Sequence, residues 1–185
     1  MKVIKAKTAG FCFGVKRAVD TVYKQVDTKC GQIYTYGPII HNEEVIKDMR
    51  DKGVIVLRSE EDLDMISQGT VIIRSHGVEK RIYEKIEQKG LRIVDATCPF
   101  VKKIHNIVSE KSGEGFHIII IGNPEHPEVV GIKGWAKDNV TVIQSAEDAE
   151  CFTADRKEKI CIVSQTTFNY NKFKELVEIL RKKEL

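Results

Sequence analysis

Short apolar runs alternate with amphipathic runs along almost the whole of this 185-residue chain. The apolar runs have the length of β-strands, and the amphipathic runs repeat apolar residues every three or four positions, as helices do. Strands are expected at residues 3–6, 33–36, 54–57, 71–73, 92–94, 117–121, 140–143 and 160–163. Helices are expected between them, for example from about Val15 and over residues 43–50. This βαβα order favours an α/β fold with parallel sheets and helices on their faces.

The chain is slightly longer than a usual single domain, so two small domains are possible. Four expected strands precede a loop near residues 92–99, where a boundary is most economical. We therefore predict two α/β lobes, residues 1–96 and 97–185. Each is expected to be a small four-stranded parallel layer of βαβ units with flanking helices.

Composition argues against several classes of protein. Thirty basic and 27 acidic residues give a formal net charge of +3 without a long block of one sign, which favours a solvated surface over nucleic-acid binding. The most apolar segment, residues 117–121, is too short to cross a membrane, and lysines interrupt the N-terminal run where a signal peptide is apolar. Five cysteines without a secretory signal favour a reducing compartment. We expect a cytoplasmic protein.

Two cysteines have matching settings, Cys12 in AGFCFGVKRA and Cys98 in VDATCPFVKK. Each follows an expected strand and precedes an expected helix, where the helix dipole and free N–H groups favour a thiolate. Cys161 differs, since it lies within an apolar strand and is expected in the core. The pair favours a soft metal centre, although clusters use three or four thiolates and only two are well placed.

Three histidines also follow expected strands, namely His41, His76 and His126. Ligands of open α/β sheets bind beyond the carboxyl ends of the strands, so the three are expected at one edge. Imidazoles beside helix N-termini form an anion pocket, because the helix end itself attracts phosphate. A phosphorylated or diphosphorylated small molecule is therefore the expected ligand.

Glu128 and Thr166 lie at the same predicted edge. Glu128 is two residues from His126, at the start of a helix that Pro127 can begin, and a carboxyl group there could act as a general acid. Thr166 could orient a substrate hydroxyl or relay a proton to it. The plainer alternatives are a first-turn helix acid for Glu128 and an ordinary N-cap for Thr166.

A metal-dependent phosphohydrolase or a phosphate-binding protein is the main alternative. It would place a hard or borderline cation among imidazoles and carboxylates. Its ligands would come from His41, His76, His126, Asp95 and Glu128. This alternative accounts for the histidines but gives Cys12 and Cys98 no role.

Six segments, in order across the whole chain, together resemble one enzyme family. They are AGFCFGVKRAVD, IIHNEEV, RSHGV, VDATCPFV, EHPEVVG and SQTT. With these motifs the chain resembles the 4-hydroxy-3-methylbut-2-enyl diphosphate reductases, the LytB/IspH iron–sulfur enzymes that end the non-mevalonate isoprenoid pathway.

The resemblance implies a trefoil of three small α/β lobes around a [4Fe–4S] cluster held by three cysteines. It implies that Cys12 and Cys98 are two of the cluster ligands and that Glu128 is the proton source, with Thr166 near the substrate hydroxyl. The histidines implied to line the substrate diphosphate pocket are His41, His76 and His126.

The implied reaction is a two-electron reductive dehydroxylation that gives isopentenyl and dimethylallyl diphosphates. A small ferredoxin or flavodoxin is the implied electron donor. In the family the third cysteine ligand follows the SQTT motif and leads into the third lobe, whereas this sequence ends at Leu185. We therefore expect the first two of three lobes, without the C-terminal third domain, and an inactive or weakly active fragment. A non-catalytic module with the family fold is the further alternative.

Overall fold

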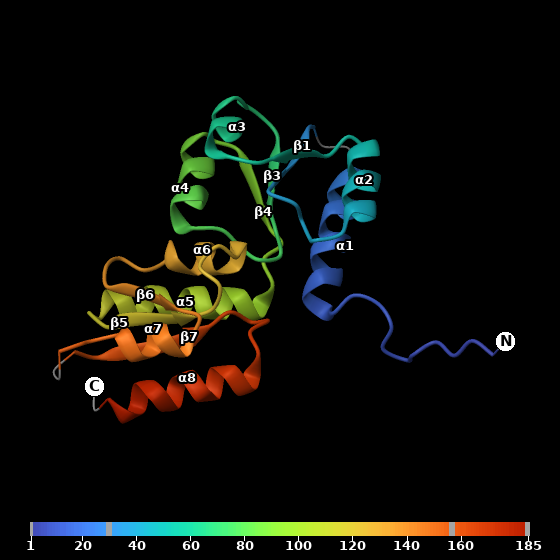
Figure 1. The fold of residues 1–185 in the computed structure, drawn as a ribbon. Coiled ribbons are helices and arrows are strands. Elements are labelled where there is room, and N and C mark those ends of the chain that lie inside the picture. Colours follow the sequence, from blue (N-terminus) through green and yellow to red (C-terminus); the bar gives the residue numbers. More distant parts are fainter. Residues whose placement is uncertain (1, 29–30, 156–157, 184–185) are drawn as a thin grey trace. The chain divides into compact units, whose positions relative to one another are not determined.

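The computed structural model of the protein describes residues 2–28, 31–155 and 158–183. The chain forms two compact units, each built around a parallel sheet (Figure 1). The first unit comprises Met1–Ser75 and Lys89–Cys98, and the second comprises His76–Gln88 and Pro99–Leu185. The segment His76–Gln88 therefore belongs to the second unit, although the residues on either side of it in the sequence belong to the first. The simpler division into residues 1–96 and 97–185 stays a prediction.

The first unit has a four-stranded sheet in the order β2-β1-β3-β4. Its strands are β1 (Ile33–Tyr36), β2 (Ile55–Leu57), β3 (Thr70–Ile73) and β4 (Arg92–Asp95). All pairs are parallel, and β3, which is buried along its whole length, pairs with β1 from Ile33↔Thr70 to Tyr36↔Ile73. Parallel strands covered by helices are expected to be this apolar.

Two helices of the first unit, α1 (Phe13–Thr28) and α2 (Glu43–Asp51), share one core with its sheet (Figure 1). Ala18 and Val22 of α1 are fully buried, and Met49 of α2 packs in the same cluster as Ile72 of β3. Asn42 caps α2 by accepting the Val45 N–H at 3.0 Å. A short third helix, α3 (Glu60–Asp64), buries Leu63.

The second unit has a three-stranded parallel sheet in the order β6-β5-β7. Its strands are β5 (His117–Ile121), β6 (Val140–Ile143) and β7 (Ile160–Ser164). Helices α5 (Pro99–Gly113) and α6 (Pro127–Lys133) cover one face, and α7 (Ala146–Cys151) and α8 (Tyr170–Lys182) cover the other (Figure 1). Ile118 and Ile120 face the first pair of helices, whereas Ile119 and Ile121 face the second, so β5 is buried on both sides.

The helix α4 (Lys80–Gln88) and the loop before it belong to the second unit. The indole N–H of Trp135 donates to the Val78 carbonyl at 2.9 Å, and the Trp135 ring stacks on His105 with 5.0 Å between centroids. Gly134 lies so close to Glu79 that an added Cβ would be 2.4 Å from the Glu79 Cβ. These contacts fix the segment that carries His76.

The sequence-based predictions hold for most elements and fail in three places. Residues 3–6 form no strand, and Val3 and Ile4 are 80% and 79% exposed. Lys5 interrupts this short run, and the described sheet of the first unit is completed without it. The second sheet has three strands instead of the expected four, because β4 pairs with β3 in the first sheet.

The third difference is the pair of short helices α3 and α7, which were not expected. Each begins after a serine whose hydroxyl accepts the N–H of an aspartate three residues later: Ser59 from Asp62, and Ser145 from Asp148. This Ser-x-x-acid spacing is a helix-start signal that is independent of apolar periodicity.

Among the described residues, no helix is both long and apolar enough to cross a membrane.

The α7 cap gives the first testable prediction. The Asp148 carboxylate accepts N–H bonds from Gln144 at 2.9 Å and Ser145 at 3.0 Å, and these bonds, the Gln144 bond foremost, hold its pKa below the ordinary value. Asp148→Ala should lower the free energy of unfolding by about 1 kcal/mol at neutral pH. Because the pKa of Asp148 in the folded chain is lower than the ordinary value of 3.8, its hydrogen bonds stabilise the fold at pH values above 3.8. This stabilisation is lost as the pH falls through the lowered pKa.

Urea unfolding of the variant and the unmodified chain at pH 7 and at acid pH measures this difference. Glu147→Ala is the matched control, because Glu147 is an exposed acid in the same first turn that makes no capping bond. An equal, pH-independent loss in both variants would show that the Asp148 bonds do not stabilise α7.

Candidate functional site

Cys12 and Cys98 both lie beside the first turn of α1 in the first unit. Cys12 directly precedes α1, and its carbonyl accepts the Lys16 N–H at 2.9 Å. The Cys98 thiol packs against Gly14, where an added Cβ would lie 2.6 Å from the Cys98 Sγ. Both cysteines thus adjoin the same helix start. Cys12 does not follow a strand as expected, since residues 3–6 are not one.

Arg17 of α1 holds the loop that carries Cys98. Its guanidinium donates to the carbonyl oxygens of Thr97 at 2.8 Å and Asp95 at 3.3 Å. The Asp95 carboxylate in turn accepts the Thr97 N–H at 2.9 Å, and the Cys98 N–H donates to Ser75 at 2.8 Å. The Arg17 contact is absent from the sequence-based prediction, although Arg17 lies five residues after Cys12 within the motif AGFCFGVKRA.

Cys161 behaves as the sequence predicts. It lies in β7 and packs with the core of α5 and α6. Burial raises the pKa of its thiol, which keeps the thiol protonated and a poor metal ligand.

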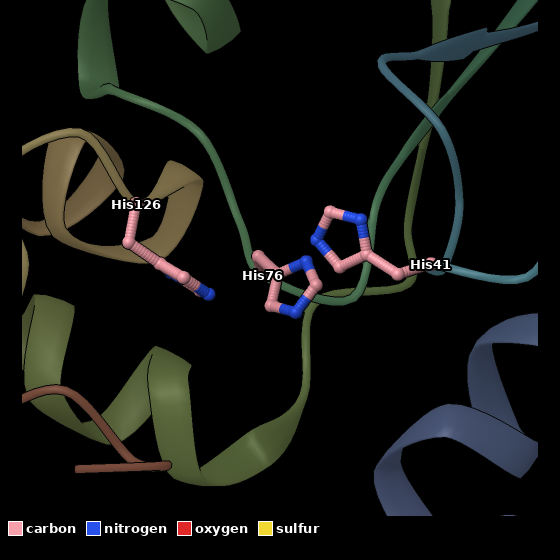
Figure 2. A group of neighbouring side chains, drawn as sticks. All are labelled: His41, His76 and His126. Atoms are coloured by element: carbon pink, nitrogen blue, oxygen red, sulfur yellow. The ribbon is translucent and has the colours of Figure 1, made fainter.

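In the second unit, His76 and His126 face each other edge to face (Figure 2). Their ring centroids are 5.4 Å apart, and the ring planes are at 89°. His126 is the N-cap of α6, where its Nδ1 accepts the Glu128 N–H at 3.1 Å. A ring nitrogen that accepts a hydrogen bond carries no proton, so the neutral His126 has its proton on Nε2. The cap thus selects one tautomer of the neutral ring.

Glu128 is 1% exposed and binds Thr166, 38 residues away in the sequence. The Thr166 backbone N–H donates to Oε1 at 2.6 Å, and the Thr166 hydroxyl donates to Oε2 at 2.9 Å. Both carboxylate oxygens are therefore held by one residue. A buried carboxyl group fixed against a hydroxyl can exchange a proton with it over one hydrogen bond.

Gln165, which is also buried, joins the loops that carry Glu128 and Thr166. Its side-chain carbonyl accepts the Asn123 N–H at 3.2 Å, and its amide donates to the Thr167 hydroxyl at 2.7 Å. Gly122 leaves room for it, because an added Cβ would lie 3.0 Å from the Gln165 Cβ. Neither Gln165 nor Gly122 has a predicted role; the signal in the sequence is a Gly-Asn pair directly after the most apolar strand.

His41, also labelled in Figure 2, comes from the first unit. It is exposed and lies on the loop after β1, next to the α2 cap Asn42. The structure thus places Cys12, Cys98 and His41 in one unit. It places His76, His126, Glu128 and Thr166 in the other, where Glu128 contacts both His126 and Thr166. That both groups act on one ligand stays a prediction.

Fold and side chains together define a parallel α/β protein with a thiol pair at a helix start and a buried carboxyl group held by a threonine. The LytB protein family model matches residues 3–185, and the chain belongs to this family.

Curated relatives and solved structures agree with this assignment. The chain is 45% identical over 184 residues to a protein of Caldanaerobacter subterraneus, and 42% identical to one of Clostridioides difficile, both named 4-hydroxy-3-methylbut-2-enyl diphosphate reductase. These matches cover 99% of this chain but 63% and 65% of the relatives, so the chain spans about two thirds of their length. The solved reductase from Plasmodium falciparum has a TM-score of 0.88 at 31% identity, covering 96% of this chain and 55% of that one. A second solved reductase, titled the terminal enzyme of the non-mevalonate pathway, has a TM-score of 0.81 at 38% identity and covers 97% and 63%.

The Glu128–Thr166 pair gives the second prediction. In Glu128→Gln the side-chain carbonyl can still accept the Thr166 N–H and the amide can donate to its hydroxyl, so the free energy of unfolding should change little. In Glu128→Leu both Thr166 donors lose their acceptor, which should cost on the order of 1–3 kcal/mol. Urea unfolding of the two variants measures the difference. Equal stability of the Leu and Gln variants would show that these bonds do not join the two loops.

Proposed function

We propose that this chain provides the first two lobes of a 4-hydroxy-3-methylbut-2-enyl diphosphate reductase, which forms isopentenyl and dimethylallyl diphosphates. The observation that carries the proposal is the 45% identity, over 99% of the chain, to a relative with that name. The Glu128–Thr166 contact supports it independently, because a reductive dehydroxylation must protonate the leaving hydroxyl group, and a carboxyl group bonded to a threonine hydroxyl can relay a proton. The remaining third of the relatives' length would supply the third lobe.

The thiols fit the cluster that such a reductase requires. Cys12 and Cys98 are soft donors beside one helix turn, and the space at Gly14 allows the Cys98 thiol to approach that turn. We assign them as two protein ligands of a [4Fe–4S] cluster, with the third cysteine in the part of the protein outside this chain. When bound, the cluster would supply electrons and an iron that acts as a Lewis acid.

The three histidines are assigned to the diphosphate of the substrate. The His126 cap directs Nε2–H as a donor, and a neutral imidazole donor binds a phosphate oxygen. His76 lies against it in the same unit, and His41 would approach from the other. A diphosphate held this way would position the hydroxyl end of a short substrate near Thr166.

Glu128 and Thr166 would deliver the proton. Breaking the C–O bond with two electrons needs two protons, of which one lets the hydroxyl group leave as water and the other is added to carbon. A protonated Glu128 can pass its proton to the Thr166 hydroxyl while that hydroxyl gives its own proton to the substrate oxygen. Burial of Glu128 limits competing exchange with water.

The electrons would come from a small one-electron carrier, a ferredoxin or a flavodoxin, in the cytoplasm. The odd cysteine count supports a reducing compartment. The phosphohydrolase alternative has less support. The Asp95 carboxylate accepts the Thr97 N–H, and both oxygens of Glu128 accept hydrogen bonds from Thr166, so these carboxylates already have partners.

The third prediction concerns the thiols. The 185-residue chain, reconstituted anaerobically with iron and sulfide, should bind substoichiometric cluster and show little turnover. A fusion with the C-terminal third of the Caldanaerobacter relative should gain stoichiometric [4Fe–4S] absorption and reductase activity. Cys98→Ser should abolish both in the fusion. Cys151→Ser, at an exposed free cysteine, is the control and should retain both. Full turnover by the unfused chain would contradict the proposed division of ligands.

The fourth prediction separates the proton path from the cluster. In the same fusion, Glu128→Gln should reduce kcat about 10²–10⁴-fold while cluster absorption is unchanged, because a general acid contributes this much. Thr166→Val should lower kcat, and Thr166→Ser should restore most of it. Unchanged kcat in Glu128→Gln would remove Glu128 from the proton path.

A further inference from the structure

A cavity that none of the residues assigned above lines lies within the first unit. Its volume is about 620 Å³, which is the size of small-molecule sites. It is bounded by one side of α2, by the loop after β1 and by the ends of β2 and β3. None of the assigned cysteines, histidines, Glu128 or Thr166 lines it.

Cationic side chains from three elements converge on this cavity. Lys47 and Arg50 come from α2, one turn apart, Arg58 follows β2, and Arg74 follows β3. They outnumber the two carboxylates of the lining, Glu43 and Glu44 in the first turn of α2. Within the described ranges, Lys47, Arg50 and Arg58 form no side-chain ion pair, so their charges are not neutralised internally.

The Arg74 side chain packs against Gly37, the residue that directly follows β1. Gly37 has φ of +72°, and an added Cβ would lie 2.5 Å from the Arg74 Nη1 and 3.1 Å from its Cδ. The guanidinium group therefore lies directly over Gly37, where only glycine leaves both the space and the backbone conformation. Burial lowers the pKa of Arg74 from its ordinary value, and a nearby anion would offset that cost.

The rest of the lining is apolar. Pro38, Ile46 and Val56 form an apolar wall of the cavity. A free phosphate would use the arginines alone, whereas a phosphate ester with a small hydrocarbon group would use both surfaces. Arginine is the side chain suited to phosphate oxygens, since its planar group donates two parallel hydrogen bonds.

We propose that the cavity between α2 and the ends of β1, β2 and β3 binds a small phosphate or diphosphate ester with an apolar group, at a site distinct from the assigned reductase residues. Arg50, Arg58 and Arg74 bind the phosphate, and the wall of Pro38, Ile46 and Val56 covers the apolar group. The proposal does not depend on the reductase assignment, because it uses no residue of that site.

The test is a titration of the 185-residue chain without cluster, followed by amide NMR. Isopentenyl diphosphate, inorganic diphosphate and inorganic phosphate are the three probes. Amides of Lys47 and Val56 should shift with isopentenyl diphosphate, and more weakly with the two inorganic anions, which lack the apolar group. Equal affinity for inorganic and isopentenyl diphosphate would reject the apolar part of the proposal. No saturable shift with any probe at millimolar concentration would reject the site.

Substitutions connect the shifts to the cavity. Arg50→Ala and Arg58→Ala should each weaken binding about tenfold, whereas Arg92→Ala, at an exposed position of β4 outside the cavity, should leave it unchanged. Gly37→Ala should weaken binding by displacing Arg74. Gly53→Ala is its control, because Gly53 also has positive φ, at +86°, but an added Cβ there meets no atom within 4 Å.

His126→Asn separates the two sites, because asparagine keeps the α6 cap and removes the imidazole. Binding at Lys47 and Val56 should persist in this variant. Loss of those shifts in His126→Asn, or their persistence at full affinity in Arg50→Ala and Arg58→Ala, would overturn the proposal. Neither outcome would bear on cluster assembly or turnover in the fusion protein.

Discussion

Parallel strand pairing is the constraint on which the rest of this structure depends. The five strand pairs described in the two sheets are all parallel. Every strand of a sheet therefore begins at the same end of that sheet. The chain must return over a helix after each strand, and every strand-to-helix loop opens at one edge. The loops with Cys98, His41, His126 and Thr166 are all of this type. Functional side chains that are distant in the sequence can therefore lie at the same edge of a sheet.

Periodicity predicted most of the fold because the strands are short, apolar and regularly spaced. The strands at 33–36, 117–121 and 140–143 have the predicted bounds. Residues 3–6 have a similar pattern but form no strand, since a strand also needs a partner, and pairing is a property of the tertiary structure. For the same reason β4 could not be assigned to the first sheet from the sequence alone. The short helices α3 and α7 have too few residues for a period and depend on their caps.

The sequence predicted which residues belong to the candidate site better than it predicted the contacts between them. Glu128 and Thr166 were both singled out because each follows a strand, and the structure joins them by two hydrogen bonds. His126 also caps α6, and the cap determines which ring nitrogen carries the proton in the neutral ring. The contacts of Arg17 with Thr97 and of Gln165 with Asn123 were not predicted, because each joins residues that are distant in the sequence. Long-range contacts of single polar side chains leave no periodic signal.

The segment His76–Gln88 has a consequence for how the protein can be divided. It leaves the first unit after β3, contributes α4 to the second unit, and returns for β4. The backbone thus passes between the units three times, and no single cut separates them. A truncation at any one of the three crossings would leave one unit without a segment that completes it. Each unit has its own sheet and core, but neither corresponds to one continuous stretch of the sequence.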